Sequence, residues 1–103
     1  MKVFLDDERK TPEGWERTYT PQETINWLKT GTVTHLSLDH DLGDDERIGT
    51  GYDVVLWLEE TCYKNKNFKL PEATIHSANN SASAKMKQAI EKIKERIINN
   101  EYL

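Results

Sequence analysis

The sequence predicts one α/β domain over residues 1–103, with about four parallel β-strands in a sheet and helices packed on both faces, three layers in all. Short β-prone runs alternate with helical segments along the later two-thirds of the chain, which is typical of parallel strands joined by helical crossovers. A chain of 103 residues can build one modest hydrophobic core. Every conspicuous polar cluster follows the carboxyl end of a predicted strand, where parallel sheets bind their ligands.

Four segments are predicted as strands. Residues 2–5 (KVFL) are β-prone and end abruptly at two aspartates, and residues 15–20 (WERTYT) alternate bulky and polar side chains. Residues 35–39 (HLSLD) run into a long acidic stretch, and residues 72–77 (EATIHS) run into small polar residues. If these strands are parallel, the polar residues at their carboxyl ends gather at one edge of the sheet.

The first predicted helix has a clearly marked start. Thr20 is its candidate N-cap, Pro21 suits the first helical position, and Glu23 completes a capping box. The helix is expected to run to about Thr30 and to stop at Gly31.

Two longer helices are predicted in the second half of the chain. Residues 45–51 (DERIGTG) are expected to form a loop, because their two glycines suit tight turns. Helices are then expected over about residues 52–63 and about residues 81–98. The last helix carries a stripe of residues expected in the core: Ala82, Met86, Ala89, Ile90, Ile93 and Ile97.

The composition limits the classes of function. Eighteen acidic and 14 basic residues give a net charge of -4, which argues against a protein whose main role is coating nucleic acid. A small phosphorylated ligand remains compatible, since a cation can mediate the contact. The single cysteine, Cys62, cannot form an internal disulfide, and no apolar run approaches the length of a membrane span. With no signal-peptide pattern at the N-terminus, we expect a cytoplasmic protein without a membrane partner.

Two acidic clusters point to a cation site. Asp6 and Asp7 follow the strand at residues 2–5, Asp39 ends the strand at residues 35–39, and Asp41 follows it. If these strands are neighbours, carboxylates about 4 Å apart repel by roughly 4 kcal/mol at an effective dielectric constant near 20. Such a cluster must take up protons or bind a cation. Mg²⁺ is the first expectation and Mn²⁺ the second, held by Asp6, Asp7 and Asp39 with Asp41 as a further ligand.

The alternative is that these acids only cap helices or lie in solvated loops. We prefer that interpretation for Asp44, Asp45 and Glu46, and the cation site for Asp6, Asp7 and Asp39.

Other polar residues near the same edge are candidates for binding phosphate, which Mg²⁺ commonly meets in proteins. Arg9 and Arg47 lie near the acidic clusters in sequence and can hold phosphate oxygens, or can pair with the same acids. Ser77 and Asn79 precede the last helix, whose first N–H groups can bind an anion; ordinary helix capping is the alternative.

Two histidines flank the edge and are candidates for acid–base chemistry. His40 follows the third predicted strand and His76 is the second-last residue of the fourth, and the pKa of histidine ordinarily lies near neutrality. Each can instead be a packed, hydrogen-bonded residue.

The stretches FLDDE, LSLDHDLG, GTGYDVVLWL and IHSAN together resemble the receiver domain of two-component signalling. The resemblance implies that Asp6 and Asp7 are that family's acidic pair and that Asp39 is its phosphate-accepting aspartate. It further implies that Asp41 lies where a backbone carbonyl reaches the metal, and that Gly51 and Ser77 match two further family motifs.

The departures from a receiver point to a shortened relative. Residues 6–14 are too few for the helix that usually joins the first two strands, and the chain ends without a fifth strand, its lysine and a fifth helix. With FLDDERKTPEGW and LSLDHDLGDDERIGTGYDVVLWLEE, the chain resembles the cyclic-phosphate processing receiver-like domain over almost its whole length. This implies a truncated receiver/flavodoxin-like fold with strand order 2-1-3-4.

Three functions are compatible with these features. The first is metal-dependent hydrolysis of a cyclic phosphate, either a cyclic nucleotide or a 2′,3′-cyclic phosphate, with Asp39, His40 and His76 as candidate catalytic residues. The second is a module that binds such a ligand without turnover, and the third is a switch phosphorylated on Asp39. The missing fifth strand argues against the switch, and it leaves an exposed strand edge that a homodimer or the last helix can cover.

Overall fold

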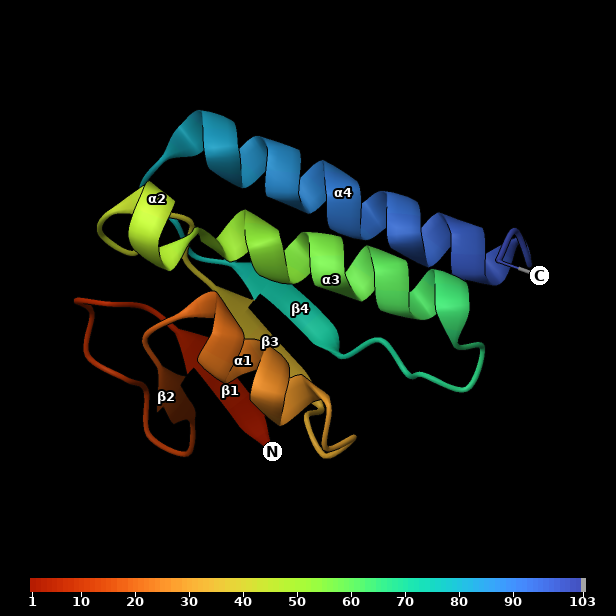
Figure 1. Ribbon diagram of the computed structural model, residues 1–103, viewed down its shortest axis with the longest axis horizontal. Coiled ribbons are helices and arrows are strands. Elements are labelled where there is room, and N and C mark those ends of the chain that lie inside the picture. Colours follow the sequence, from red (N-terminus) through yellow and green to blue (C-terminus); the bar gives the residue numbers. More distant parts are fainter. Residues whose placement is uncertain (103) are drawn as a thin grey trace.

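The computed structural model describes residues 1–102, which form one sheet covered by helices (Figure 1). The elements in chain order are β1 (Lys2–Leu5), β2 (Glu16–Thr18), α1 (Pro21–Leu28), β3 (His35–Leu38), α2 (Asp45–Ile48), α3 (Gly51–Lys64), β4 (Glu72–Ile75) and α4 (Asn80–Ile98).

The sheet has the predicted strands in the predicted order. β1 pairs with β2 on one side and with β3 on the other, and β3 pairs with β4, so that the order is β2-β1-β3-β4. All three pairings are parallel, and residues 1–102 contain no fifth strand. The truncated receiver/flavodoxin-like α/β fold is therefore confirmed.

The three long helices form one layer on one face of the sheet, which corrects the expectation of helices on both faces. α1 packs against α3, and α3 packs against α4. All three contribute buried side chains to the same core, and Figure 1 shows them on the same side of the strands. The described chain is thus a two-layer structure with one sheet face left without a long helix.

The direction of the connections explains this arrangement. The crossovers from β2 through α1 to β3, and from β3 through α3 to β4, move across the sheet in the same direction. Right-handed crossovers that move in one direction place their helices on the same face. Only the connection from β1 to β2 moves the other way, and its residues, 6–15, form no helix.

The core lies between the helices and the side chains that alternate toward them along the strands. Its fully buried members from the sheet are Val3, Leu5, Leu36 and Leu38, and those from the helices include Val54, Val55, Leu58 and Met86. Ile97, which was expected in the core, is 41% exposed. The 19-residue helix α4 is about 28 Å long, roughly twice the length of the four-residue strand β4, so its last turn extends beyond the sheet.

The opposite side chains form what we call the uncovered face of the sheet. Its members are Lys2, Phe4, Arg17, His35, Ser37, Glu72 and Thr74, all placed by strand alternation. Phe4 is nevertheless buried, because the rings of Trp15 and His76 lie against it. The uncovered face thus has a small aromatic cluster beneath the carboxyl ends of the strands.

Local signals set most element boundaries. Thr20 is the N-cap of α1 and Pro21 begins it, as predicted, but the carboxylate of Glu23 accepts from the Tyr19 N–H and the Thr20 hydroxyl rather than closing a capping box. The predicted loop at residues 45–51 instead contains the one-turn helix α2, because the side chain of Asp44 caps the N–H of Glu46.

The one-sided core predicts different effects for substitutions on the two sheet faces. Leu36→Ala removes a fully buried side chain that faces the helices, and should lower the free energy of unfolding by about 2–5 kcal/mol. Glu72→Gln, on the exposed part of β4, should change it by less than about 0.5 kcal/mol. Urea denaturation of both variants measures the difference, and equal effects would contradict the two-layer arrangement.

Candidate functional site

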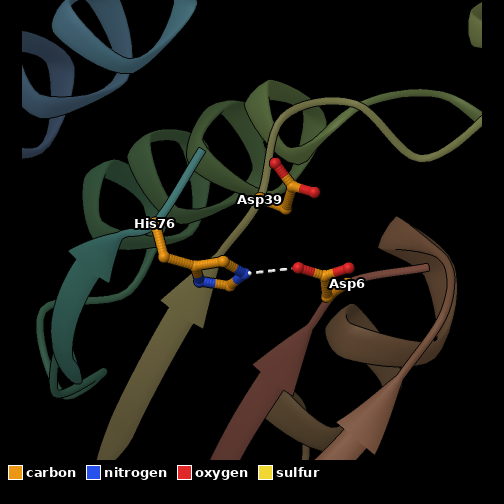
Figure 2. A group of neighbouring side chains, drawn as sticks. All are labelled: Asp6, Asp39 and His76. Carbon is orange, nitrogen blue, oxygen red and sulfur yellow. Dashed lines mark hydrogen bonds and ion pairs between the residues drawn. The ribbon is translucent and has the colours of Figure 1, made fainter. Parts of the chain in front are cut away.

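Three strands bring Asp6, Asp39 and His76 together at the carboxyl edge of the sheet. Each residue directly follows its strand: Asp6 follows β1, Asp39 follows β3 and His76 follows β4. One potential ligand atom from each side chain lies within 4.8 Å of the others (Figure 2). Because β1, β3 and β4 are parallel neighbours, this convergence is a direct consequence of the sheet topology.

Asp6 is wholly buried, and both of its carboxylate oxygens accept hydrogen bonds. Its Oδ1 accepts from the backbone N–H groups of Glu8 at 2.7 Å and Arg9 at 2.8 Å. Its Oδ2 accepts from Nε2 of His76 at 2.9 Å. Burial on its own raises the pKa of Asp6, but these hydrogen bonds and the nearby imidazole outweigh burial and hold its pKa below the usual range. The side chain is therefore an anion at neutral pH.

Asp39 is half-buried and keeps one carboxylate oxygen free. Its Oδ1 accepts from the N–H of His40 at 2.8 Å, and Oδ2 makes no hydrogen bond within residues 1–102. Its own N–H donates to the carbonyl of Leu5 at 3.0 Å, which fixes the end of β3 against the end of β1.

Gly51 allows α3 to begin directly against this segment. Its N–H donates to the carbonyl of His40 at 3.1 Å, and a Cβ at this position would overlap the carbonyl oxygen of Asp39. The helix also has a complete capping box between Thr50 and Asp53, so the contact lies at a firmly fixed helix start. Any larger residue than glycine must displace the backbone that carries Asp39.

The carboxylates border a pocket of about 350 Å³, which we call the acidic pocket. Its lining residues are Asp6, Asp7, Glu8, Arg9, Asp39, Asp41, Gly43 and Ala78. All four residues predicted as metal ligands, Asp6, Asp7, Asp39 and Asp41, are among them, and so is Arg9, a predicted phosphate-binding residue. The Nε of Arg9 lies 3.9 Å from Oδ2 of Asp6, and its side chain is about half exposed.

His40 does not line the acidic pocket, but its side chain contacts Asp41, which does. Its Nδ1 lies 2.7 Å from Oδ1 of Asp41, and its side chain is 19% exposed. Its Nε2 makes no hydrogen bond within residues 1–102 and is not a buried unpaired atom. One ring nitrogen is thus held by a carboxylate while the other is open for proton exchange.

Besides the two histidines, three further candidates do not line the acidic pocket. Arg47 lies exposed on α2. Ser77 and Asn79 serve the start of α4: the Ser77 hydroxyl accepts from the N–H of Asn79 at 3.1 Å, and the Asn79 side chain accepts from the N–H of Ala82 at 3.2 Å. The residue between them, Ala78, is the one that reaches the pocket.

His76 has both ring nitrogens occupied. Besides the contact with Asp6, its Nδ1 lies 2.6 Å from the hydroxyl oxygen of Ser37, and its ring stacks on Phe4 with centroids 4.3 Å apart. Neither Ser37 nor Phe4 was among the sequence candidates. A signal existed for Ser37, since it is a small polar residue between Leu36 and Leu38 in a strand where alternation places it on the other face.

The donor set fits a hard divalent cation. Asp6 and Asp39 each use Oδ1 to accept backbone N–H groups, which fixes their orientation, and both line the acidic pocket with Asp7 and Asp41. Oδ2 of Asp6 also accepts from His76, whereas Oδ2 of Asp39 makes no hydrogen bond within residues 1–102. Carboxylate oxygens are the ligands that Mg²⁺ and Mn²⁺ prefer. These four residues could therefore hold such an ion.

The fold and the acidic edge define a receiver-type α/β domain, and comparison with known proteins agrees. The family model for the cyclic-phosphate processing receiver domain matches residues 1–92, so the chain belongs to that family. No curated protein and no solved structure matches the chain significantly. Within residues 1–102, no helix has the length and hydropathy needed to cross a membrane.

The close approach at Gly51 gives a testable prediction. Gly51→Ala should lower the free energy of unfolding by about 1–3 kcal/mol, because the new methyl group must displace the Asp39 backbone. The backbone amide signals of Asp39 and His40 should shift in a ¹H–¹⁵N spectrum. Unchanged stability together with unchanged signals would show that α3 does not position Asp39.

The lowered pKa of Asp6 predicts a specific pH dependence of stability. Since the pKa is lower in the folded state than its ordinary value of 3.8, Asp6 stabilises the fold above that pH and loses this effect as the pH falls through the folded-state pKa. Wild type should therefore lose more stability than Asp6→Asn between about pH 5 and about pH 3. Urea denaturation with a chelator present measures this, and parallel losses would contradict the assignment.

Proposed function

We propose that this protein hydrolyses a phosphodiester bond in a cyclic phosphate, in a reaction that depends on a divalent cation. The substrate class is a cyclic nucleotide or a 2′,3′-cyclic phosphate. The observation that carries the proposal is the pairing of Asp6 and Asp39, each oriented by backbone N–H groups, in one acidic pocket. Membership of the cyclic-phosphate processing receiver family supports the choice of substrate class.

The acidic pocket would hold Mg²⁺ or Mn²⁺ through Asp6 and Asp39, with Asp7 and Asp41 as further ligands. A bound divalent ion supplies Lewis-acid chemistry, polarising a phosphoryl oxygen and positioning a water. The protein contributes carboxylates whose positions are already set by the ends of β1 and β3, so little reorganisation is needed on binding.

Arg9 is the residue best placed to bind a phosphoryl oxygen. It lies in the lining of the acidic pocket, and its half-exposed guanidinium is only loosely associated with Asp6, at 3.9 Å. A guanidinium forms strong charge-assisted hydrogen bonds to phosphate oxygens. Arg47 lies outside the pocket, so we assign it no part in the proposed function.

His40 is the better candidate of the two histidines for proton transfer. Opening a cyclic phosphate breaks one P–O bond, forms another to water, and leaves an alkoxide oxygen that needs a proton. Nε2 of His40 would supply that proton, and the proton lost by the attacking water would restore the imidazole. Asp41 orients the ring through Nδ1, as a carboxylate orients histidine in other hydrolytic sites.

We further propose that the protein acts in the reducing cytoplasm. The proposal is supported by its single cysteine, Cys62, which is buried, and burial raises the pKa of the thiol. A buried thiol of raised pKa is poorly reactive, so it is suited to a core rather than to disulfide exchange.

The proposal is tested by incubating the protein with cyclic nucleotides and with RNA ending in a 2′,3′-cyclic phosphate. Product is followed by ³¹P NMR and chromatography, with Mn²⁺, with Mg²⁺ and with a chelator. We expect ring opening only with a divalent ion, and a loss of at least about 100-fold in turnover for Asp39→Asn. His40→Gln should lose turnover while still binding Mn²⁺.

Asp45→Asn is the matched control, because it removes an acid from the same segment that is exposed on α2 and outside the acidic pocket. It should behave as wild type. Metal binding and ligand binding without any turnover would replace the enzyme proposal with a binding module. Stable phosphorylation of Asp39 by acetyl phosphate would instead favour a receiver-type switch.

A further inference from the structure

We propose that Ser37 and His76 form a positioning relay for Asp6, and that neither residue contacts the substrate. In this relay the Ser37 hydroxyl donates to Nδ1 of His76, and Nε2–H of His76 donates to Oδ2 of Asp6. The relay holds the Asp6 carboxylate in the orientation that a divalent cation in the acidic pocket requires. This inference rests on the metal site of the proposed function, and it assigns His76 a role different from acid–base catalysis.

The relay links three neighbouring strands at one edge. Ser37 lies in β3, His76 follows β4, and Asp6 follows β1, so the imidazole reaches across the end of β3, the strand between β4 and β1 (Figure 2). The Ser37 Oγ to His76 Nδ1 distance is 2.6 Å, and the His76 Nε2 to Asp6 Oδ2 distance is 2.9 Å. Both are within ordinary hydrogen-bond range.

The chemistry of the end groups sets the direction of the hydrogen bonds. An ionised carboxylate can only accept, so the contact with Asp6 requires a proton on Nε2 of His76. With the proton on Nε2, Nδ1 of the neutral imidazole is an acceptor, and the Ser37 hydroxyl is a donor that fits it. Every polar atom of the relay then has a partner, as buried polar groups require.

Packing fixes the ring in the same position. The imidazole stacks on the Phe4 ring with an interplanar angle of 4° and a centroid distance of 4.3 Å. The exposed fractions are 7% for Ser37, 16% for the His76 side chain and 1% for the Asp6 side chain. A flip of the ring would exchange carbon for nitrogen at both ends and break both hydrogen bonds, so the side chain has one favoured orientation.

The same three residue types form the nucleophilic triad of serine hydrolases, but the geometry here argues against that chemistry. In that triad Nε2 faces the serine and Nδ1 faces the aspartate, whereas here the two nitrogens are exchanged. Ser37 is also nearly buried on the uncovered face, within β3, and lies outside the lining of the acidic pocket. A substrate phosphorus in that pocket therefore has no route to its hydroxyl.

The acidic pocket receives Asp6 but not His76. His76 approaches Asp6 from the side of the uncovered face, while Asp6 itself lines the pocket. Hydrogen-bond partners behind a metal-binding side chain orient it and tune its basicity, and their loss typically weakens metal binding about 10–100-fold. The arrangement therefore makes His76 a positioning residue for the metal ligand Asp6. His40 is left as the candidate for proton transfer.

The relay is tested by titrating Mn²⁺ alone into the full chain and following free Mn²⁺ by electron paramagnetic resonance. Ser37→Ala and His76→Phe should each weaken Mn²⁺ binding by about 10–100-fold, because the first removes the hydrogen bond that orients the imidazole and the second removes the N–H that donates to Asp6. Ser37→Thr restores the hydroxyl and should bind within about threefold of wild type, and Glu72→Gln on the same face is the matched control. Circular dichroism and urea denaturation confirm that each variant folds.

A second readout tests the hydrogen bonds without metal. Long-range ¹H–¹⁵N NMR of the histidine rings should show His76 as the Nε2–H tautomer in wild type and in Ser37→Thr, and an altered Nδ1 signal in Ser37→Ala. Unchanged Mn²⁺ affinity in Ser37→Ala and His76→Phe, with wild type binding Mn²⁺, would overturn the relay alone. Failure of wild type to bind Mn²⁺ would overturn the metal site and the role of the relay with it, and an Nδ1–H tautomer would overturn the hydrogen-bond assignment.

Discussion

A buried carboxylate at the end of β1 is the constraint on which the rest of the site depends. Asp6 is fully removed from solvent-accessible surface, and an anion in that position must be compensated. Two backbone N–H groups from the following residues and the imidazole of His76 compensate it. The two backbone N–H groups hold the loop that follows β1, and the imidazole connects the end of β1 to the end of β4. The site and the carboxyl edge of the sheet are therefore held by the same contacts.

At this edge, the helical face and the uncovered face of the sheet position different residues of the site. On the helical side, the start of α3 approaches the backbone of Asp39 so closely that only glycine fits at position 51. On the uncovered side, which carries no long helix, the His76 ring stacks on Phe4 and contacts both Ser37 and Asp6. The polar support for Asp6 therefore comes from side chains of the sheet and not from a covering helix. The acidic pocket is lined at this edge by residues that follow β1 and β3, and by Ala78 from the segment after β4.

Strand positions and the gathering of the aspartates could be predicted because both follow from local pattern and parallel topology. The one-sided helix layer could have been deduced from the direction of each crossover, but the number of helices alone does not reveal it. The roles of Ser77 and Asn79 depended on a competition between helix capping and ligand binding, which sequence cannot resolve. His76 contacts Ser37, which is 39 positions away in the sequence, and Asp6, which is 70 positions away. No local sequence pattern encodes contacts over such separations.

The central claim is that Asp6 and Asp39 share a divalent cation in the acidic pocket. The most direct measurement is anomalous diffraction from crystals of the full chain soaked in Mn²⁺. The account predicts one strong anomalous peak within about 2.5 Å of carboxylate oxygens of both Asp6 and Asp39. A fully soaked crystal with no peak there, and with both carboxylates bound only to protein and water, would contradict it.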